Sequence, residues 1–344
     1  MSSPHIKSKR SHHIDVMKGF LILMVVLGHV CYILQKTTDM ELTLSPYYII
    51  SFICNNLIAP YYMAAFFLIT GYCSNFSKPF GSQLWQDFRR LIVPGVLLLL
   101  IMKLLMNIVE THALFNTFLG GVFIPWFLSA LFLGKVIVRG VLEICIPKVW
   151  KICFVGMFSV LGCLFMEKKT FENIYAIHQA FAFAIFIYIG HLLHMYRNHH
   201  RKSLIWVAMT FYLMVFFYYV IVRHGGCPSL CEIITFRWYC WPAYILMALS
   251  GSYIVYIISE FIQKNKVLEY LGRNSLVIYV THGTFLFFFS WFVKYLRIDV
   301  NVNVYIAAFI LVCMTIGGAL WGSLWSWFLN FRHTRWILGK ATKK

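Results

Sequence analysis

The sequence predicts an all-α membrane protein, a single bundle of about ten transmembrane helices with both termini in the cytoplasm. Three observations predict it. Of the 344 residues, 60% are hydrophobic and only 12% are charged, and the mean hydropathy is +0.74, which is more apolar than the core of a soluble domain requires. The apolar residues form runs long enough to cross a bilayer. Lysine and arginine gather in alternate loops.

The candidate spans follow one another with short connections. They are residues 19–35, 57–76, 91–109, 124–145, 149–166, 176–196, 204–222, 241–262, 275–293 and 304–329. The segment 46–56 is too polar and too short for a span, so we expect it to lie against the membrane or to re-enter it. No small-residue cleavage site follows the first apolar run, which predicts a retained helix rather than a signal peptide.

Basic residues set the predicted orientation. With the N-terminus inside, the cytoplasmic segments carry about three times as many Lys and Arg residues as the opposite side. The net charge of +18 is therefore assigned to topology and to contact with anionic membrane lipids. No basic stretch is interleaved with aromatic residues in a solvated domain, so we expect no nucleic-acid partner.

The loops are short, and neither end holds enough residues for a folded soluble domain. Residues 1–344 are therefore expected to form one integral membrane domain. Residues 1–18 are a basic cytoplasmic tail and helix start, and residues 330–344 are a second basic cytoplasmic tail. Any chemistry must then occur within the helical bundle or at its faces.

The first span carries ionisable side chains on one face, namely Asp15, Lys18 and His29. The spacing from Lys18 to His29 returns the helix to within about 20° of the same direction and raises His29 by about 16 Å. His29 then lies about halfway through a hydrocarbon layer of about 30 Å, with Lys18 at its edge. Ionisable groups are costly at that depth, so this face predicts a functional site.

Five sequence segments lie in order along nearly the whole chain. They are Lys18 with His29 after ten intervening residues, 66–72 (FFLITGY), 88–94 (FRRLIVP), 126–128 (WFL) and 271–282 (LGRNSLVIYVTH). In this order they resemble landmarks of the acyltransferase-3 family of integral membrane proteins, which O-acylate glycans. The last segment especially resembles the branch that includes sugar O-acetylases.

The resemblance implies a membrane O-acyltransferase. Its substrates would be acyl-CoA on the cytoplasmic side, with acetyl as the expected group, and a hydroxyl of a cell-envelope glycan or of its lipid-linked precursor. The implied location is the cell membrane, multi-pass, in a bacterial inner membrane or a plasma membrane. Family members with a fused extracytoplasmic hydrolase-like domain pass the acyl group to it, and this chain carries none. Direct transfer, or transfer to a separate extracytoplasmic transferase, is therefore expected.

His29 is the expected catalytic base. O-acylation needs a group that takes the proton of a hydroxyl as it attacks a thioester carbonyl, and an imidazole that titrates near neutrality suits this task. Lys18, Arg89 and Arg90 lie at the predicted cytoplasmic mouth, where they would bind the phosphates of acyl-CoA. In the family the two arginines often form Arg-x-x-Arg, whereas here they are adjacent. Acyl-CoA is a substrate, and no permanently bound cofactor and no metal are expected.

Each of these residues also has a structural alternative. His29 could hydrogen-bond a neighbouring helix, and Lys18 could anchor a helix end at the membrane surface. Arg89 and Arg90 serve the positive-inside pattern in any case. Asp15 could be a first-turn residue favoured by the helix dipole, or it could pair with Lys18 or Arg90.

Further candidates lie later in the chain. Asn274 fits a helix start after a glycine-containing turn better than it fits chemistry. Tyr279 belongs to the same segment, and His282 either faces the cavity of His29 or makes a structural hydrogen bond. His191 and His194 have a spacing that can bind metal, but no carboxylate or cysteine accompanies them.

The cysteines suggest no chemistry. Most of the ten lie in apolar spans, where they act as small hydrophobic residues. Cys227, Cys231 and Cys240 lie close enough in sequence for a disulfide, whose connectivity the sequence leaves open.

The main alternative function is a secondary transporter or a flippase for a glycan or lipid-linked intermediate, because a ten-helix bundle with buried polar residues would serve either. A transporter would show paired broken helices in two related halves, and the sequence contains no such internal repeat. A membrane sensor is disfavoured because no signalling domain is attached.

Overall fold

The computed structural model describes residues 11–37, 46–107, 125–167, 176–196, 203–223, 227–228, 238–295, 304–331 and 334–338. Every element assigned within these residues is a helix, which confirms the predicted all-α class. The α-helices are α1 (His12–Thr37), α2 (Pro46–Ile58), α3 (Tyr62–Cys73), α4 (Phe80–Asp87), α5 (Val93–Asn107), α7 (Trp126–Glu143), α8 (Lys148–Glu167), α9 (Ile177–Met195), α10 (Leu204–Phe217), α11 (Trp241–Ile262), α12 (Lys266–Arg273), α13 (Ser275–Tyr295) and α14 (Val304–Leu329). Short π or 3-10 turns are η1 (Phe88–Ile92), η3 (Tyr218–Val222), η4 (Trp238–Cys240) and η5 (Arg335–Leu338).

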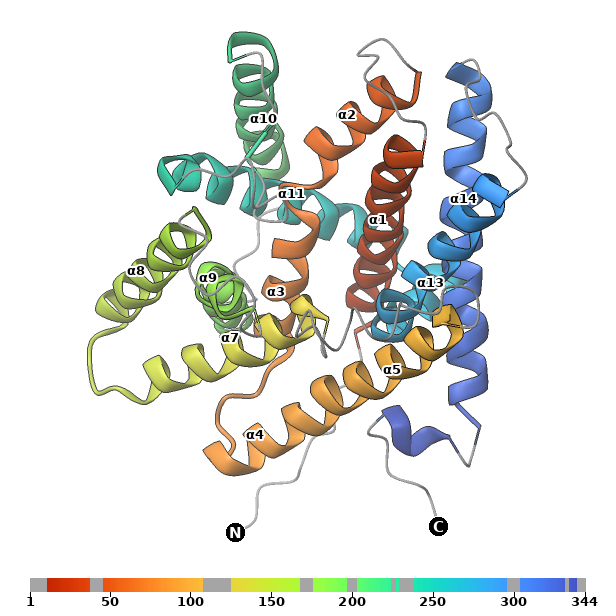
Figure 1. Cartoon of the computed structure of the whole chain (residues 1–344). Helices are drawn as coiled ribbons and strands as arrows, with labels where there is room; N and C mark the ends of the chain where they lie inside the picture. The colour runs from red at the N-terminus through yellow and green to blue at the C-terminus, as the bar shows by residue number, and fades with distance from the viewer. Residues whose placement is uncertain are drawn as a thin grey trace.

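A helix coincides with each predicted span. Within the described residues, 8 helical segments are long and apolar enough to cross a membrane, so the chain is a multi-pass membrane protein. The two other predicted spans correspond to α5, described over 15 residues, and to α7, which carries three charged residues among its 18. In Figure 1, α1 begins at its lower end, and the short blue helix η5 lies farther down, at the bottom of the view.

The segment 46–56 lies in α2. The second half of α2 continues through a turn into α3, so the second apolar segment begins at Phe52 rather than at residue 57. The amide of Asn56, one of the polar groups that disfavoured a span here, is hydrogen-bonded inside the protein. Its Nδ2 donates to the carbonyl of Phe52 at 2.7 Å, and its Oδ1 accepts the backbone N–H of Cys227 at 2.5 Å. Polar groups paired in this way can lie in an apolar segment.

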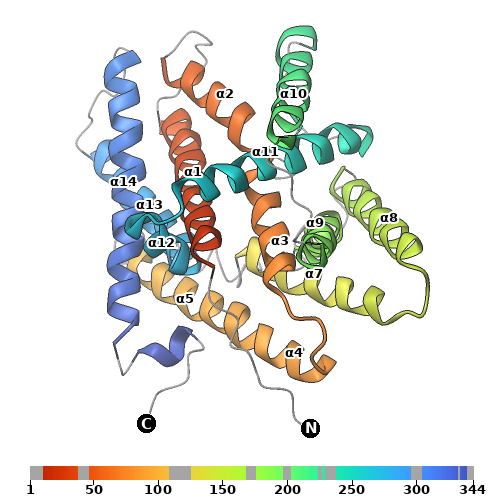
Figure 2. The same ribbon diagram turned by 180° about the vertical axis from the view of Figure 1, so that it is seen from behind.

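Helix α1 lies at the centre of the bundle. It packs on α2, α3, α11, α12, α13 and α14, and Figure 1 shows it between α3 and the pair α13 and α14. Seen from behind in Figure 2, α11 crosses α1. A second group forms where α9 packs on α3, α7 and α8. Because α3 packs on both α1 and α9, it joins the two groups.

The contact of α3 with α9 brings backbone against backbone. A Cβ at Gly71 would collide with the carbonyl oxygen of Ile187, and a Cβ at Gly190 would collide with that of Leu68. Glycine at both positions therefore allows the close approach of the two backbones. This contact fixes α3 against α9 and so places the aromatic side chains of α3 that approach the candidate site.

Candidate functional site

The imidazole of His29 is oriented by its own helix. Its Nδ1 lies 2.8 Å from the carbonyl oxygen of Val25, one turn earlier in α1. A carbonyl oxygen only accepts hydrogen bonds, so Nδ1 carries the hydrogen and Nε2 keeps its lone pair. The side chain of His29 is exposed, whereas Val26 and Val30 beside it are buried. A lone pair on the ring of an exposed histidine is what a general base requires.

A second histidine, His282 of α13, lies against His29. The ring centroids are 4.9 Å apart and the ring planes are inclined by 69°. The Nδ1 of His282 lies 3.0 Å from the carbonyl oxygen of Ile278, so its Nε2 also keeps the lone pair. His282 is only 4% exposed, and its Nε2 has no hydrogen-bond partner among the described residues.

Aromatic rings continue from this pair toward α3. Tyr279 lies 6.1 Å from His282 and 5.0 Å from Phe127 of α7, measured between ring centroids. Phe127 in turn lies 5.8 Å from Phe66 and 5.3 Å from Phe67. Four of the five sequence landmarks, those on α1, α3, α7 and α13, therefore meet at one place.

The structure gives Asp15 a partner that the sequence does not suggest. Nε of Arg273 lies 3.3 Å from the Asp15 carboxylate, and Nη2 of Arg273 lies 2.5 Å from that of Glu269. Nδ1 of His12 also lies 3.0 Å from Glu269. The predicted partners of Asp15 were a lysine on the same helix and an arginine of the second-to-third span turn. The observed ion pair arises because α12 lies directly on the start of α1.

Glycine at two positions allows α12 to pack closely on α1. A Cβ at Gly19 would collide with the backbone of Leu268, and a Cβ at Gly272 would collide with the carbonyl oxygen of Asp15. Asn265 caps the start of α12, and its side-chain oxygen accepts two backbone N–H groups of the first turn at 3.0 Å each. Such a cap fixes where a short helix starts. The glycines and the cap together hold Arg273 beside Asp15.

Asn274 separates α12 from α13. Its Nδ2 donates to the carbonyl of Tyr270 at 2.9 Å, and its own carbonyl accepts the N–H of Ile278 at 3.1 Å. The helix start predicted after the glycine-containing turn is observed at Ser275. This side-chain hydrogen bond, however, closes the end of α12, so Asn274 serves the turn between the two helices.

The predicted donor-binding residues lie on two different elements. Lys18 is partly buried on α1, next to Gly19. Arg89 and Arg90 are exposed on η1, the π-helical turn between α4 and α5. In Figures 1 and 2, α4 and α5 pass below the end at which α1 begins. The elements that carry the three cations thus lie on the same side of the molecule.

The structure also describes the histidines and cysteines that the sequence offers as metal or disulfide candidates. His191 and His194 lie edge-on to aromatic rings, at 5.1 and 5.2 Å between centroids. The described residues contain no group of three or more His, Cys, Asp and Glu side chains that could hold a metal ion. Cys227 and Cys240 are free thiols, and burial raises the pKa of Cys227 to about 12. Cys231 lies outside the described residues.

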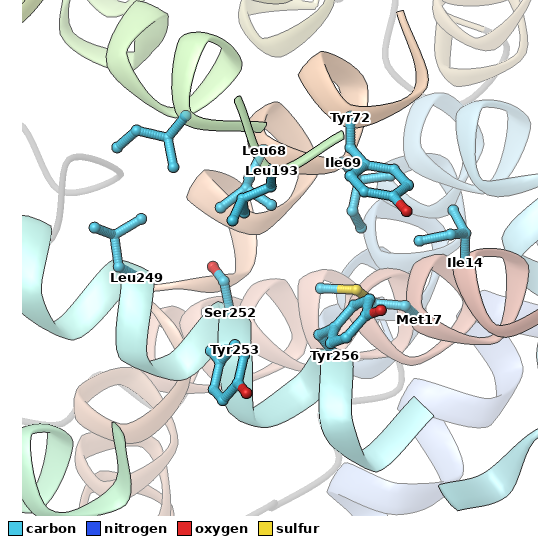
Figure 3. Close-up of a pocket in the computed structure, with 11 residues that line it drawn as sticks. Ile14, Met17, Leu68, Ile69, Tyr72, Leu193, Leu249, Ser252, Tyr253 and Tyr256 are labelled. Carbon is cyan, nitrogen blue, oxygen red and sulfur yellow. The ribbon is translucent and has the colours of Figure 1, made fainter. Parts of the chain in front are cut away.

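A separate cavity of about 250 Å³ lies between α1, α3, α9 and α11. Figure 3 shows its wall, which is apolar apart from Ser252 and three tyrosine hydroxyls. Met17 lines it from α1, so His29 lies about 18 Å farther along that helix. The sequence gives no sign of this cavity, because its lining comes from four helices and has no spacing that marks a site.

A family model described as an acyltransferase domain matches residues 11–328. The matched region begins just before α1 and ends within α14, so it includes the helices that carry His29, Phe127 and His282. No curated protein and no solved structure matches the chain. The family that the sequence resembles is thereby confirmed. The chain belongs to this acyltransferase family and is a multi-pass membrane enzyme that transfers acyl groups.

Proposed function

We propose that this enzyme moves an acyl group, in the simplest case acetyl, from cytoplasmic acyl-CoA to a hydroxyl of a cell-envelope glycan or of its lipid-linked precursor. The observation that carries the proposal is the Nε2 lone pair of His29, an exposed residue whose Nδ1 contacts the carbonyl of Val25, in a chain of an acyltransferase family. The proposed location is a bacterial inner membrane or a plasma membrane.

His29 acts as the general base in this reaction. Its Nε2 takes the proton of the acceptor hydroxyl while the hydroxyl oxygen attacks the thioester carbonyl. The new C–O bond forms, the C–S bond breaks, and the departing thiolate takes the proton from His29. The products are the O-acyl ester and free CoA, and His29 returns to its neutral form.

A donor on the cytoplasmic side is supported by the cations on the side of the molecule where α1 begins. The phosphates of acyl-CoA are anions, and arginine matches their geometry. The carrier arm would extend from this side toward His29, about 16 Å along α1 from Lys18.

A glycan acceptor is supported by the resemblance of residues 271–282 to the sugar O-acetylase branch. Two side chains of this segment, Tyr279 and His282, lie beside the proposed base. Transfer is direct, or the acyl group passes to a separate extracytoplasmic transferase.

Mass spectrometry of envelope glycans tests the proposal. Cells that lack the chain should lose one acyl substituent, and the wild-type chain should restore it. Reintroduced His29→Gln should leave the substituent missing, while His191→Gln, which changes a histidine on another membrane helix, should restore it. Identical acylation with and without the chain would contradict the proposed function.

A further inference from the structure

An ion pair joins α4 to α7 beside the turn that carries the predicted donor-binding arginines. Nζ of Lys135 on α7 lies 2.6 Å from a carboxylate oxygen of Asp87, the last residue of α4. Both side chains are largely buried, with 10% of the Lys135 side chain and 15% of the Asp87 side chain exposed. Buried charges are costly unless they are paired, so this contact fixes where the Asp87 carboxylate lies.

The same ion pair fastens η1 to α7. Asp87 immediately precedes η1, the π-helical turn that carries Arg89 and Arg90, and short π segments within helices frequently occur at functional sites. The turn packs on α7, where the ring of Phe88 lies edge-on to that of Phe132 at 6.2 Å between centroids. The ion pair and this ring contact together set the position of the two arginines.

The position of the Asp87 carboxylate decides whether Arg90 is available to a ligand. The charge of Arg90 acts on that of Lys135, so the Arg90 guanidinium lies near the ion pair. Asp87 and Arg90 are also only three residues apart, a separation at which an acid and an arginine on one helix commonly pair. Arg90 is nevertheless exposed, and it forms no ion pair within the part of the chain that the structure describes. Lys135 accounts for this, because it holds the carboxylate against α7.

The charges around the ion pair favour an anion on its exposed side. Lys78 is a second exposed cation whose charge acts on Lys135. Its Nζ donates to Oε1 of Gln86 at 2.9 Å, and this amide carries no charge. The negative charge of Asp87 is matched by Lys135, so Lys78 and Arg90 keep their positive charges at the surface. Such a surface suits the phosphates of acyl-CoA.

We propose that Lys135 is a positioning residue for the acyl-CoA donor, because it withholds Asp87 from Arg90 and leaves the guanidinium available to the donor phosphates. Lys135 is itself buried and does not touch the donor. Without its ammonium group, the Asp87 carboxylate turns toward Arg90 and competes with the phosphates. This inference rests on the proposed function, in which acyl-CoA binds at η1.

The test compares Lys135→Met with Asp87→Asn by the binding of radiolabelled acetyl-CoA to purified full-length protein in detergent. Each variant breaks the same ion pair and leaves one buried charge without its partner, so both should lose stability. Their affinities should differ. Lys135→Met frees the carboxylate to pair with Arg90, and the dissociation constant should rise roughly 3- to 10-fold, because solvent screens this exposed contact. Asp87→Asn removes the competing charge, so its dissociation constant should equal or fall below that of wild type.

Two further comparisons assign the effect to Arg90. In an Arg90→Ala background, Lys135→Met should cause no additional loss of affinity, because its effect passes through the guanidinium. Glu143→Gln is the matched control, since it makes the same carboxylate-to-amide change in the ion pair with Arg139 on α7, and it should bind like wild type. Equal shifts of affinity in Lys135→Met and Asp87→Asn, or an equal loss with and without Arg90, would overturn the role of Lys135.

The double variant that combines Lys135→Met with Asp87→Asn keeps the test decisive if a single variant does not fold. Neutral groups can replace a buried ion pair at little cost in stability. With no carboxylate to compete for Arg90, the double variant should bind acetyl-CoA within about twofold of wild type, and a larger rise in its dissociation constant would overturn the role of Lys135. Absence of acetyl-CoA binding by the wild-type enzyme would overturn the proposed function itself, so the two failures are distinguishable.

Discussion

At the residue scale, backbone carbonyls set the tautomer of the two histidines in the candidate site. His29 and His282 each direct Nδ1 to a carbonyl one turn earlier on the same helix. Both rings are therefore fixed in the tautomer that leaves Nε2 unprotonated. A helix in a membrane thus supplies the orienting group that a soluble enzyme would take from another side chain.

We expect His29→Gln to abolish acyl transfer without preventing membrane insertion. Glutamine keeps hydrogen-bonding capacity and adds no charge to the bilayer, but it cannot exchange a proton near neutrality. Turnover per correctly folded molecule, judged by size-exclusion chromatography, is the measurement. His191→Gln is the control that should keep normal turnover. A folded His29→Gln enzyme with near-normal turnover would remove His29 from the mechanism.

Removal of Arg89 and Arg90 together should weaken acyl-CoA binding. Both are exposed, so solvent screens their contacts, and we expect the dissociation constant to rise by about tenfold or more. Arg139→Ala is the matched control, because Arg139 lies on the neighbouring helix α7 and pairs with Glu143 at 2.8 Å. Equal affinity of the double variant and the parent in a direct binding measurement would place the donor phosphates elsewhere.

At the element scale, the packing of α12 on α1 requires glycine at two positions, Gly19 and Gly272. Gly272→Ala would force the two backbones apart and should lower the stability by about 1–3 kcal/mol or more. Gly156→Ala is the control, because a Cβ at Gly156 meets nothing within 4 Å. Alanine in place of glycine inside a helix stabilises by about 0.5–1 kcal/mol. In one detergent, the midpoint temperature of thermal unfolding should therefore fall for Gly272→Ala and rise for Gly156→Ala. Equal shifts of the two variants would contradict this packing.

The helices could be predicted from the sequence because lipid imposes a simple rule on them. A backbone in hydrocarbon must satisfy its own hydrogen bonds, so long apolar runs form helices. The second apolar segment begins earlier than the sequence predicts. The polar side chain of Asn56 accepts a hydrogen bond from the backbone of Cys227, a residue far away in the chain, and the sequence does not reveal this pairing. The Asp15 partner was missed for the same reason, since Arg273 is 258 positions away.

The candidate site was predictable only in part. His29 stands out because its depth in an apolar run can be calculated from the sequence alone. The neighbours of His29 depend on which helices pack against α1, and the spacing of residues contains no such information. The sequence therefore offers Tyr279 and His282 as candidates on a distant helix, while the ring contacts place them beside His29.

At the scale of the whole molecule, the proposed base, expected halfway through the membrane, suits a donor and an acceptor that approach from opposite sides. In sealed vesicles of known orientation, acyl-CoA supplied only to the cytoplasmic face should acylate a glycan confined to the other face. The acylated product, separated from the donor compartment, is the measurement. Product formed only when donor and acceptor share the cytoplasmic compartment would reject transfer across the membrane. The reaction would then take place on the cytoplasmic side alone.

The ion pair between Asp15 and Arg273 also bears on how the protein is made. Helix α1 leaves the ribosome first, whereas α12 and α13 are synthesised after most of the chain. Until they arrive, Asp15 lacks Arg273, and His29 lacks the ring of His282. A nascent chain therefore carries the proposed base early but assembles the surroundings of that base late. A product truncated before α12 would insert many helices yet leave a carboxylate near the membrane edge without its arginine.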